Sequence, residues 1–99
     1  MSAPRPLLSL IIPAYNEGER LPQTLPPVFA FLEAQPYPSE IILVNNNSRD
    51  DTRAIALEFA ATRPYLRVLD EPRQGKGAAV RSGMLAAPGA YLFMADAAS

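Results

Sequence analysis

The chain has 99 residues, 48% of them hydrophobic, which is enough for one small domain with a core of its own. Its 9 basic and 10 acidic side chains give a net charge of −1, and this balance argues against nucleic-acid binding, which usually shows a strong basic excess. Histidine and cysteine are absent, which excludes disulfides, thiolate or imidazole metal sites and histidine acid–base catalysis, so any metal must be held by oxygen, as Mg²⁺, Mn²⁺ or Ca²⁺ are.

Apolar runs and helical periodicities alternate along the first half of the chain. The continuous apolar run 7–13 is typical of a strand covered on both faces. Residues 21–34 carry an apolar stripe at helical spacing and predict a helix, which Pro26 and Pro27 bend or delay. A second buried strand is predicted at 40–44.

The second half continues the alternation with shorter elements. A helix is predicted at 51–62, with Ser48 as its N-cap and Asp50 placed to favour its positive end. The remaining elements are expected to be a strand at 66–69, a helix at 78–87 and a strand at 90–95. This order predicts an α/β fold, a parallel sheet with right-handed crossovers and helices on both faces.

The run 7–13 also bears on location. It is too short to cross a bilayer and carries no signal-peptide cleavage pattern, so it is interpreted as a strand. We therefore expect a cytoplasmic protein, and a place at the cytoplasmic face of a membrane stays open.

In a parallel sheet ligands bind at the carboxyl ends of the strands, and there the chain carries four polar loops. In the first, "PAYNE", Tyr15 suits stacking on a base and Glu17 can accept hydrogen bonds from ribose hydroxyls, although an ordinary turn also explains them. In the second, "NNNSRDD", a local turn and helix cap explain the asparagines, but the amide of Asn46 can also donate to and accept from the edge of a pyrimidine.

The third loop, "RQGKG", combines glycines with a cation. Gly75 and Gly77 allow close backbone approach, Lys76 offers a charge for phosphate, and Arg81 lies one helical turn further on. The pattern is neither a Walker A loop nor a Rossmann fingerprint, and a flexible loop with solvated charges explains it equally. The fourth loop offers Asp96, a single carboxylate of the kind that helps to hold a hard cation on a diphosphate.

Together these four loops resemble the N-terminal half of an inverting family-2 glycosyltransferase with the Rossmann-like GT-A fold, closest to the dolichyl- or polyprenyl-phosphate mannose and glucose synthases. That family reads Pro-Ala-Tyr-Asn-Glu, Asp-Asp-Gly-Ser-x-Asp-x-Thr, Gly-Lys-Gly-x-Ala-x-x-x-Gly and Phe-Met-x-Asp-Ala-Asp after successive strands. The residues that match are Pro13 to Glu17; Ser48, Asp50 and Thr52; Gly75, Lys76, Gly77, Ala79 and Gly83; and Phe93, Met94, Asp96 and Ala97. Asn45, Asn46 and Asn47 stand where the family has Asp-Asp-Gly.

The resemblance implies transfer of a sugar from a UDP- or GDP-linked donor to an acceptor, which a polyprenyl phosphate at a membrane surface would fit. The residues implied to bind the nucleotide sugar are Pro13, Ala14, Tyr15, Glu17, Asn45, Asn46, Lys76 and Arg81. Asp96 is implied to bind Mg²⁺ or Mn²⁺. No residue is assigned as the catalytic base.

Two departures qualify the resemblance. Ala98 stands where the family has a second metal-site Asp, and the chain ends at Ser99, so we expect residues 1–99 to form a single, truncated donor-binding domain without the acceptor half. The alternative function is a non-catalytic nucleotide-binding or interaction module that retains the fold. A flavodoxin-like or Rossmann-like regulator ranks lower, because the glycine fingerprint is missing. The apolar last strand, "AYLFMA", is expected at a sheet edge, where it would favour self-association.

Overall fold

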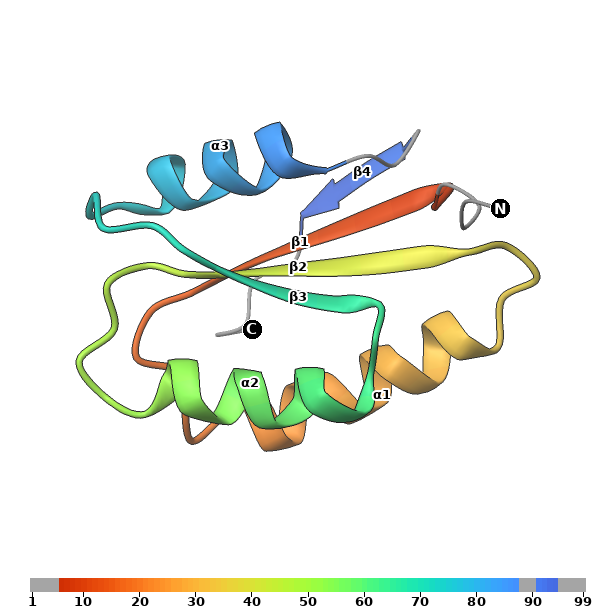
Figure 1. Ribbon diagram of the computed structural model, residues 1–99, viewed down its shortest axis with the longest axis horizontal. Helices are drawn as coiled ribbons and strands as arrows, with labels where there is room; N and C mark the ends of the chain where they lie inside the picture. Colours follow the sequence, from red (N-terminus) through yellow and green to blue (C-terminus); the bar gives the residue numbers. More distant parts are fainter. Residues whose placement is uncertain (1–5, 88–90, 95–99) are drawn as a thin grey trace.

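The computed structural model of the chain describes residues 6–87 and 91–94 (Figure 1). Strands and helices alternate in these ranges, as predicted. The elements are β1 (Leu8–Ala14), α1 (Leu21–Glu33), β2 (Ser39–Asn45), α2 (Thr52–Thr62), β3 (Leu66–Asp70), α3 (Lys76–Ala86) and β4 (Tyr91–Met94).

All strand pairings in the sheet are parallel, and the strand order is β3-β2-β1-β4. Figure 1 shows α1 and α2 on one face of the sheet and α3 on the other. The predicted parallel sheet with helices on both faces is therefore confirmed. The chain moves outward from β1 to β3 and then crosses over to β4 on the far side of β1, so the strand order reverses beside β1. The carboxyl end of β1 is where a ligand site is expected in such a sheet.

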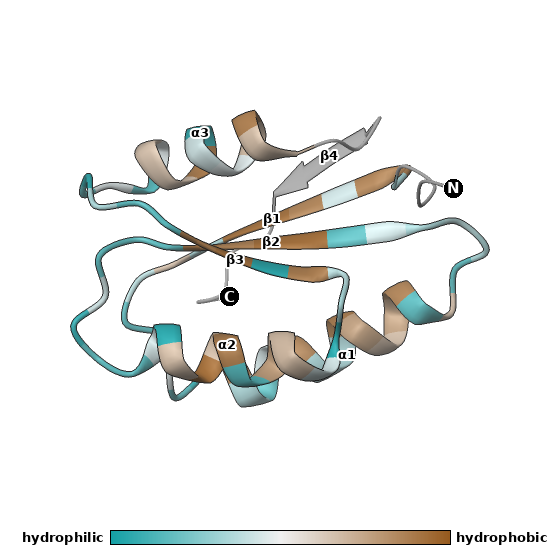
Figure 2. Ribbon diagram, viewed as in Figure 1, coloured by the Kyte–Doolittle hydropathy of each residue, from teal (hydrophilic) through white to brown (hydrophobic). Residues whose placement is uncertain are grey.

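The two central strands are apolar because both of their faces are covered. Their side chains alternate between two clusters, one under α1 and α2 that includes Ile12 and Leu43, and one under α3 that includes Ile11 and Val44. Each of these four side chains is at most 1% exposed, and burial of a side chain of this size contributes roughly 1.5–3 kcal/mol. Figure 2 shows the complementary pattern, with hydrophilic loops at the carboxyl ends of β1, β2 and β3.

One helix start agrees with the prediction and one differs. α1 begins at Leu21, as predicted, and continues through Pro26 and Pro27, so of the two effects expected of these prolines, a bend or a delay, the delay is wrong. The two prolines remove two backbone donors, but the buried apolar residues of this helix hold it against the sheet. α3 begins at Lys76 rather than at residue 78, because the chain enters the helix directly after Gly75. Lys76 therefore belongs to the first turn of a helix and not to a loop.

No helix within residues 6–87 and 91–94 has the length and apolar character needed to cross a bilayer.

The position of α3 depends on a close approach at Gly83. A Cβ atom at this residue would lie 2.5 Å from Cγ2 of Ile11 and 3.2 Å from Cγ2 of Val44, both in the central strands. The helix backbone therefore rests almost directly on the sheet.

We predict that Gly83→Ala destabilises the protein, although alanine is the better helix former. Overpacking costs about 1–3 kcal/mol and outweighs the gain of roughly 0.5–1 kcal/mol in helix propensity. Gly77→Ala is the matched control, since a Cβ atom there meets nothing within 4 Å and the variant should be at least as stable as the wild type. Urea unfolding measures both, and a Gly83→Ala variant more stable than Gly77→Ala would contradict the packing.

Candidate functional site

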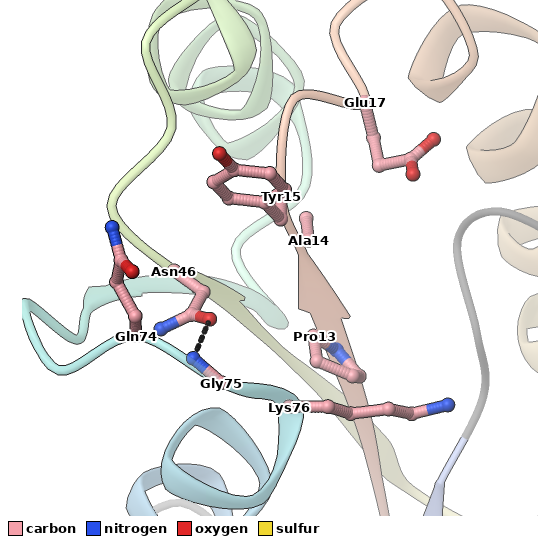
Figure 3. Close-up of a pocket in the computed structure, with 8 residues that line it drawn as sticks. All are labelled: Pro13, Ala14, Tyr15, Glu17, Asn46, Gln74, Gly75 and Lys76. Carbon is pink, nitrogen blue, oxygen red and sulfur yellow. Dashed lines mark hydrogen bonds between the residues drawn. The ribbon is translucent and has the colours of Figure 1, made fainter.

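A cavity of about 470 Å³ opens at the carboxyl end of β1, within the size range of small-molecule sites. Its lining comes from the first three of the four polar loops. Figure 3 shows the lining residues, which are Pro13, Ala14, Tyr15, Glu17, Asn46, Gln74, Gly75 and Lys76.

The first two loops are held together by the side chain of Asn16. Its Oδ1 atom accepts hydrogen bonds from the backbone N–H groups of Arg49 at 2.8 Å and Asp50 at 3.4 Å. In return, the backbone N–H of Asn16 donates to Oγ of Ser48 at 3.0 Å. Asn16 adopts a left-handed backbone with φ 51°, a conformation that asparagine tolerates better than most residues. The prediction that Ser48 caps α2 is wrong, because its hydroxyl is used in this contact between loops.

A second set of contacts joins the same two loops around Asp50. Its Oδ2 atom accepts from the backbone N–H of Gly18 at 3.1 Å, and its Oδ1 atom accepts from the backbone N–H and the hydroxyl of Thr52. The Thr52 oxygen also accepts from the backbone N–H of Glu17 at 2.9 Å. Asp50 therefore satisfies a donor at the start of α2, as its position in the sequence indicated.

These contacts change the acidity of Asp50. Burial alone would raise the pKa of its carboxyl, but the hydrogen bonds from the Thr52 side chain, the Thr52 backbone and the Gly18 backbone outweigh it and lower the pKa below the usual 3.8. The ionised form is the one that holds the two loops together.

Asn46 fastens the third loop to the end of β2. Its Nδ2 group donates to the carbonyl oxygens of Arg73 at 2.6 Å and Glu71 at 3.2 Å, and its Oδ1 atom accepts from the backbone N–H of Gly75 at 3.1 Å. The residue is 5% exposed. A carboxylate could not donate to the two carbonyl groups, so an amide is required for this set of bonds.

The bond to Gly75 sets the entrance to α3. Gly75 has φ 116° and ψ 142°, a backbone conformation that is strained for any residue with a Cβ atom. Gly75 is the N-cap of α3, and no side chain in the described ranges caps this end of the helix. Gly75 and Lys76 both line the cavity, so the N-terminus of α3 borders it. A helix N-terminus and an adjacent ammonium both favour an anion at this place.

The remaining polar groups of the cavity lie on the first loop. Tyr15 is 50% exposed and presents its ring to solvent. The Oε2 atom of Glu17 is buried and has no hydrogen-bond donor among the described residues, and the Nε atom of Arg20 lies 3.7 Å from it. A buried carboxylate oxygen that lacks a donor is suited to accept one from a ligand.

Six of the residues predicted to bind a nucleotide sugar line this cavity: Pro13, Ala14, Tyr15, Glu17, Asn46 and Lys76. Asn45 and Arg81 do not. Asn45 donates to Asp70 at 3.1 Å on the side of β3, and Arg81 lines a separate apolar hollow along α3. Asp96, predicted to bind the metal, and Ala98 both lie outside the described residues. Within the ranges that the structure describes, no group of three or more acidic side chains could hold a metal ion.

Sequence reasoning did not assign Gln74 to the site, although this residue lines the cavity. Glutamine at an exposed loop position has no distinctive periodicity or motif. The one signal in the sequence that could have identified it is its position directly before Gly75.

We predict that Asn46→Asp lowers the free energy of unfolding by about 1–3 kcal/mol, because two carbonyl groups lose their donor and face a carboxylate instead. Asn47→Gly is the control, since Asn47 is exposed and has φ 57°, which glycine adopts without strain. Each substitution introduces the residue that the resembled family has at that position. A difference between the two variants in their free energy of unfolding in urea therefore reports on the amide hydrogen bonds of Asn46. Equal stability of the two variants would show that the amide bonds contribute nothing.

Stability should also depend on pH through Asp50. Its pKa is lower in the folded state, so its contribution is complete well above pH 3.8 and is lost as the pH falls from there through the lowered folded-state pKa. Between pH 5 and pH 3, the melting temperature of the wild type should therefore fall more than that of Asp50→Asn, which cannot titrate. Parallel declines in the two proteins would rule out this role for the carboxylate.

Comparisons with known proteins agree with the fold and the loop pattern. Residues 9–97 match the family described as glycosyl transferase family 2. A dolichyl-phosphate beta-glucosyltransferase of Drosophila melanogaster is 43% identical over 98 residues, which are 91% of this chain and 30% of that protein. Dolichyl-phosphate beta-glucosyltransferase ALG5D of Trichomonas vaginalis is 39% identical over 100 residues, 95% of this chain and 31% of that protein. The chain thus spans about a third of the length of these relatives.

Solved structures give the same picture. The mannosyltransferase PcManGT from Pyrobaculum calidifontis, determined in complex with GDP-Man and Mn²⁺, superposes with a TM-score of 0.81 at 29% identity over 94% of this chain and 28% of that one. Glucosyl-3-phosphoglycerate synthase from Mycobacterium tuberculosis, at 22% identity, shares the fold with a TM-score of 0.76 over 93% of this chain and 33% of that one. With its family match covering nearly all of its length, the chain belongs to glycosyl transferase family 2 and has the GT-A fold.

Proposed function

We propose that the cavity binds the nucleoside diphosphate part of an activated sugar, and that the chain is the donor-binding domain of a glycosyltransferase. The observation that carries this proposal is the gathering of Tyr15, Glu17 and Lys76 around one cavity at the carboxyl end of β1. These side chains offer a flat ring, a carboxylate acceptor and a cation, which are the groups that a base, a ribose and a diphosphate need.

The side chains that line the cavity differ in chemistry (Figure 3). Lys76 and the first turn of α3 would receive the negative charge of the diphosphate. The Oε2 atom of Glu17, buried and without a donor among the described residues, would accept a ribose hydroxyl. Tyr15, half exposed, would lie against the base or the sugar ring. The reaction that this arrangement serves breaks the bond between the anomeric carbon and the diphosphate oxygen, forms a bond from that carbon to an acceptor oxygen, and releases the nucleoside diphosphate.

The proposal includes a divalent metal, Mg²⁺ or Mn²⁺, held by Asp96, a residue outside the described ranges. Such an ion would offset charge on the leaving diphosphate. PcManGT, with the same fold, was determined with Mn²⁺ and GDP-Man. Among the residues that line the described cavity, Glu17 carries the one carboxylate. In this part of the site the charge of the diphosphate would therefore be met by Lys76 and the N-terminus of α3 rather than by a metal ion.

The acceptor and the location are inferred from the relatives. Their names refer to dolichyl phosphate, so we propose a lipid phosphate as the acceptor, met at the cytoplasmic face of a membrane. Binding of nucleic acid is not part of the proposal, given the net charge of −1. Asn45 and Arg81 keep their predicted role only if the ligand extends beyond the described cavity. Self-association through β4, which lies at the edge of the described sheet, also stays a prediction.

We expect the purified chain to bind UDP or GDP in calorimetry, and Lys76→Ala to weaken binding of the diphosphate about tenfold or more, the effect of losing one charged hydrogen bond. Binding of uridine or guanosine, which lack phosphate, should not change. The control is Arg73→Ala, which removes a cation of the preceding loop whose side chain is 79% exposed and does not line the cavity.

The proposal fails if neither nucleotide binds at millimolar concentration with or without Mn²⁺. It also fails if Lys76→Ala and Arg73→Ala weaken binding equally, since the cavity would then have no special role.

A further inference from the structure

The amide hydrogens of Asn46 are already engaged in the protein, whereas its oxygen, with one donor, keeps a second lone pair. Both hydrogens of its amide are donated, to the carbonyl groups of Glu71 and Arg73, and its oxygen accepts from Gly75. The side chain is also 5% exposed. Asn46 therefore has no hydrogen left to donate to a ligand without releasing the third loop, although it borders the cavity.

Gln74 is in the opposite situation. It is exposed, it lines the cavity, and its carboxamide makes no hydrogen bond to any residue in the described ranges. Figure 3 shows Gln74 and Asn46 at one end of the cavity, with the Glu17 carboxylate and the Lys76 ammonium at the other. If the diphosphate and the ribose occupy the end with Lys76 and Glu17, the base reaches the end with Gln74. This step rests on the proposed function.

The conformation of the loop supports the same placement. Two of the three bonds of Asn46 fix the backbone on both sides of Gln74, at the carbonyl of Arg73 and the N–H of Gly75. A residue held in this way loses less freedom when it binds than a residue of a mobile loop, so its hydrogen bonds to a ligand contribute more.

We propose that Gln74 is the residue that reads the base, and that Asn46 positions the loop that carries it. A carboxamide offers an oxygen acceptor and an N–H donor side by side. Uracil and guanine each present a ring N–H next to a carbonyl oxygen, which is the complementary pair. Gln74 would thus accept from the ring N–H and donate to the carbonyl, and it would contribute to the choice of nucleotide.

The test is a cycle between protein and ligand variants. UDP or GDP, whichever binds more tightly, is compared with its analogue methylated at that ring nitrogen, N3 of uracil or N1 of guanine. In the wild type, methylation should weaken binding about three- to tenfold, as expected for one neutral hydrogen bond. In Gln74→Ala the two ligands should bind with the same affinity, close to that of the methylated ligand in the wild type.

Gln23→Ala is the matched control, because it removes an exposed carboxamide from α1, away from the cavity, and should leave the methylation penalty intact. Thermal unfolding checks that Gln74→Ala remains as stable as the wild type. A methylation penalty that persists in Gln74→Ala, or one that is absent from the wild type, overturns this inference and leaves the proposed function standing. Failure of the wild type to bind either nucleotide overturns the proposed function, and this inference with it.

Discussion

The amide of Asn46 is the contact on which the rest of the site depends. Through three hydrogen bonds to the backbone it holds the segment from Glu71 to Gly75 against the end of β2. That segment delivers Gln74 to one end of the cavity and starts α3, whose first residue is Lys76. Asn46 is buried, so water does not compete well for these three hydrogen bonds, and they favour a single conformation of the loop.

The first two loops are ordered by the same means, side chains that bond to backbone across a gap of about thirty residues. Asn16, Asp50 and Thr52 make these bonds. Parallel strands splay apart where their ladders end, so the backbone groups there need partners of another kind. The result is a cavity whose walls are set before a ligand arrives, which lowers the entropic cost of binding.

The fold follows from local sequence patterns, whereas the roles of the loop residues do not. Apolar runs predicted the buried strands β1 and β2, and four motifs in order indicated the family. The hydroxyl of Ser48, in contrast, fits a helix cap in the sequence, and only its partner Asn16, from another loop, shows why it does not cap. The prolines of α1 misled for a related reason, because packing against the sheet outweighs local helix propensity. Gln74 was missed since its place at the cavity is set by the hydrogen bonds of Asn46, far from it along the chain.

The bonds between the first two loops also decide where negative charge can enter. The backbone amides of the six residues Asn16, Glu17, Gly18, Arg49, Asp50 and Thr52 all point at oxygen atoms of side chains. These amides are saturated, so a phosphate approaching this rim would meet carboxylates and occupied donors. If the cavity binds a diphosphate as proposed, the start of α3 rather than the start of α2 would therefore receive its charge, and the ligand would be favoured in one orientation over the reverse.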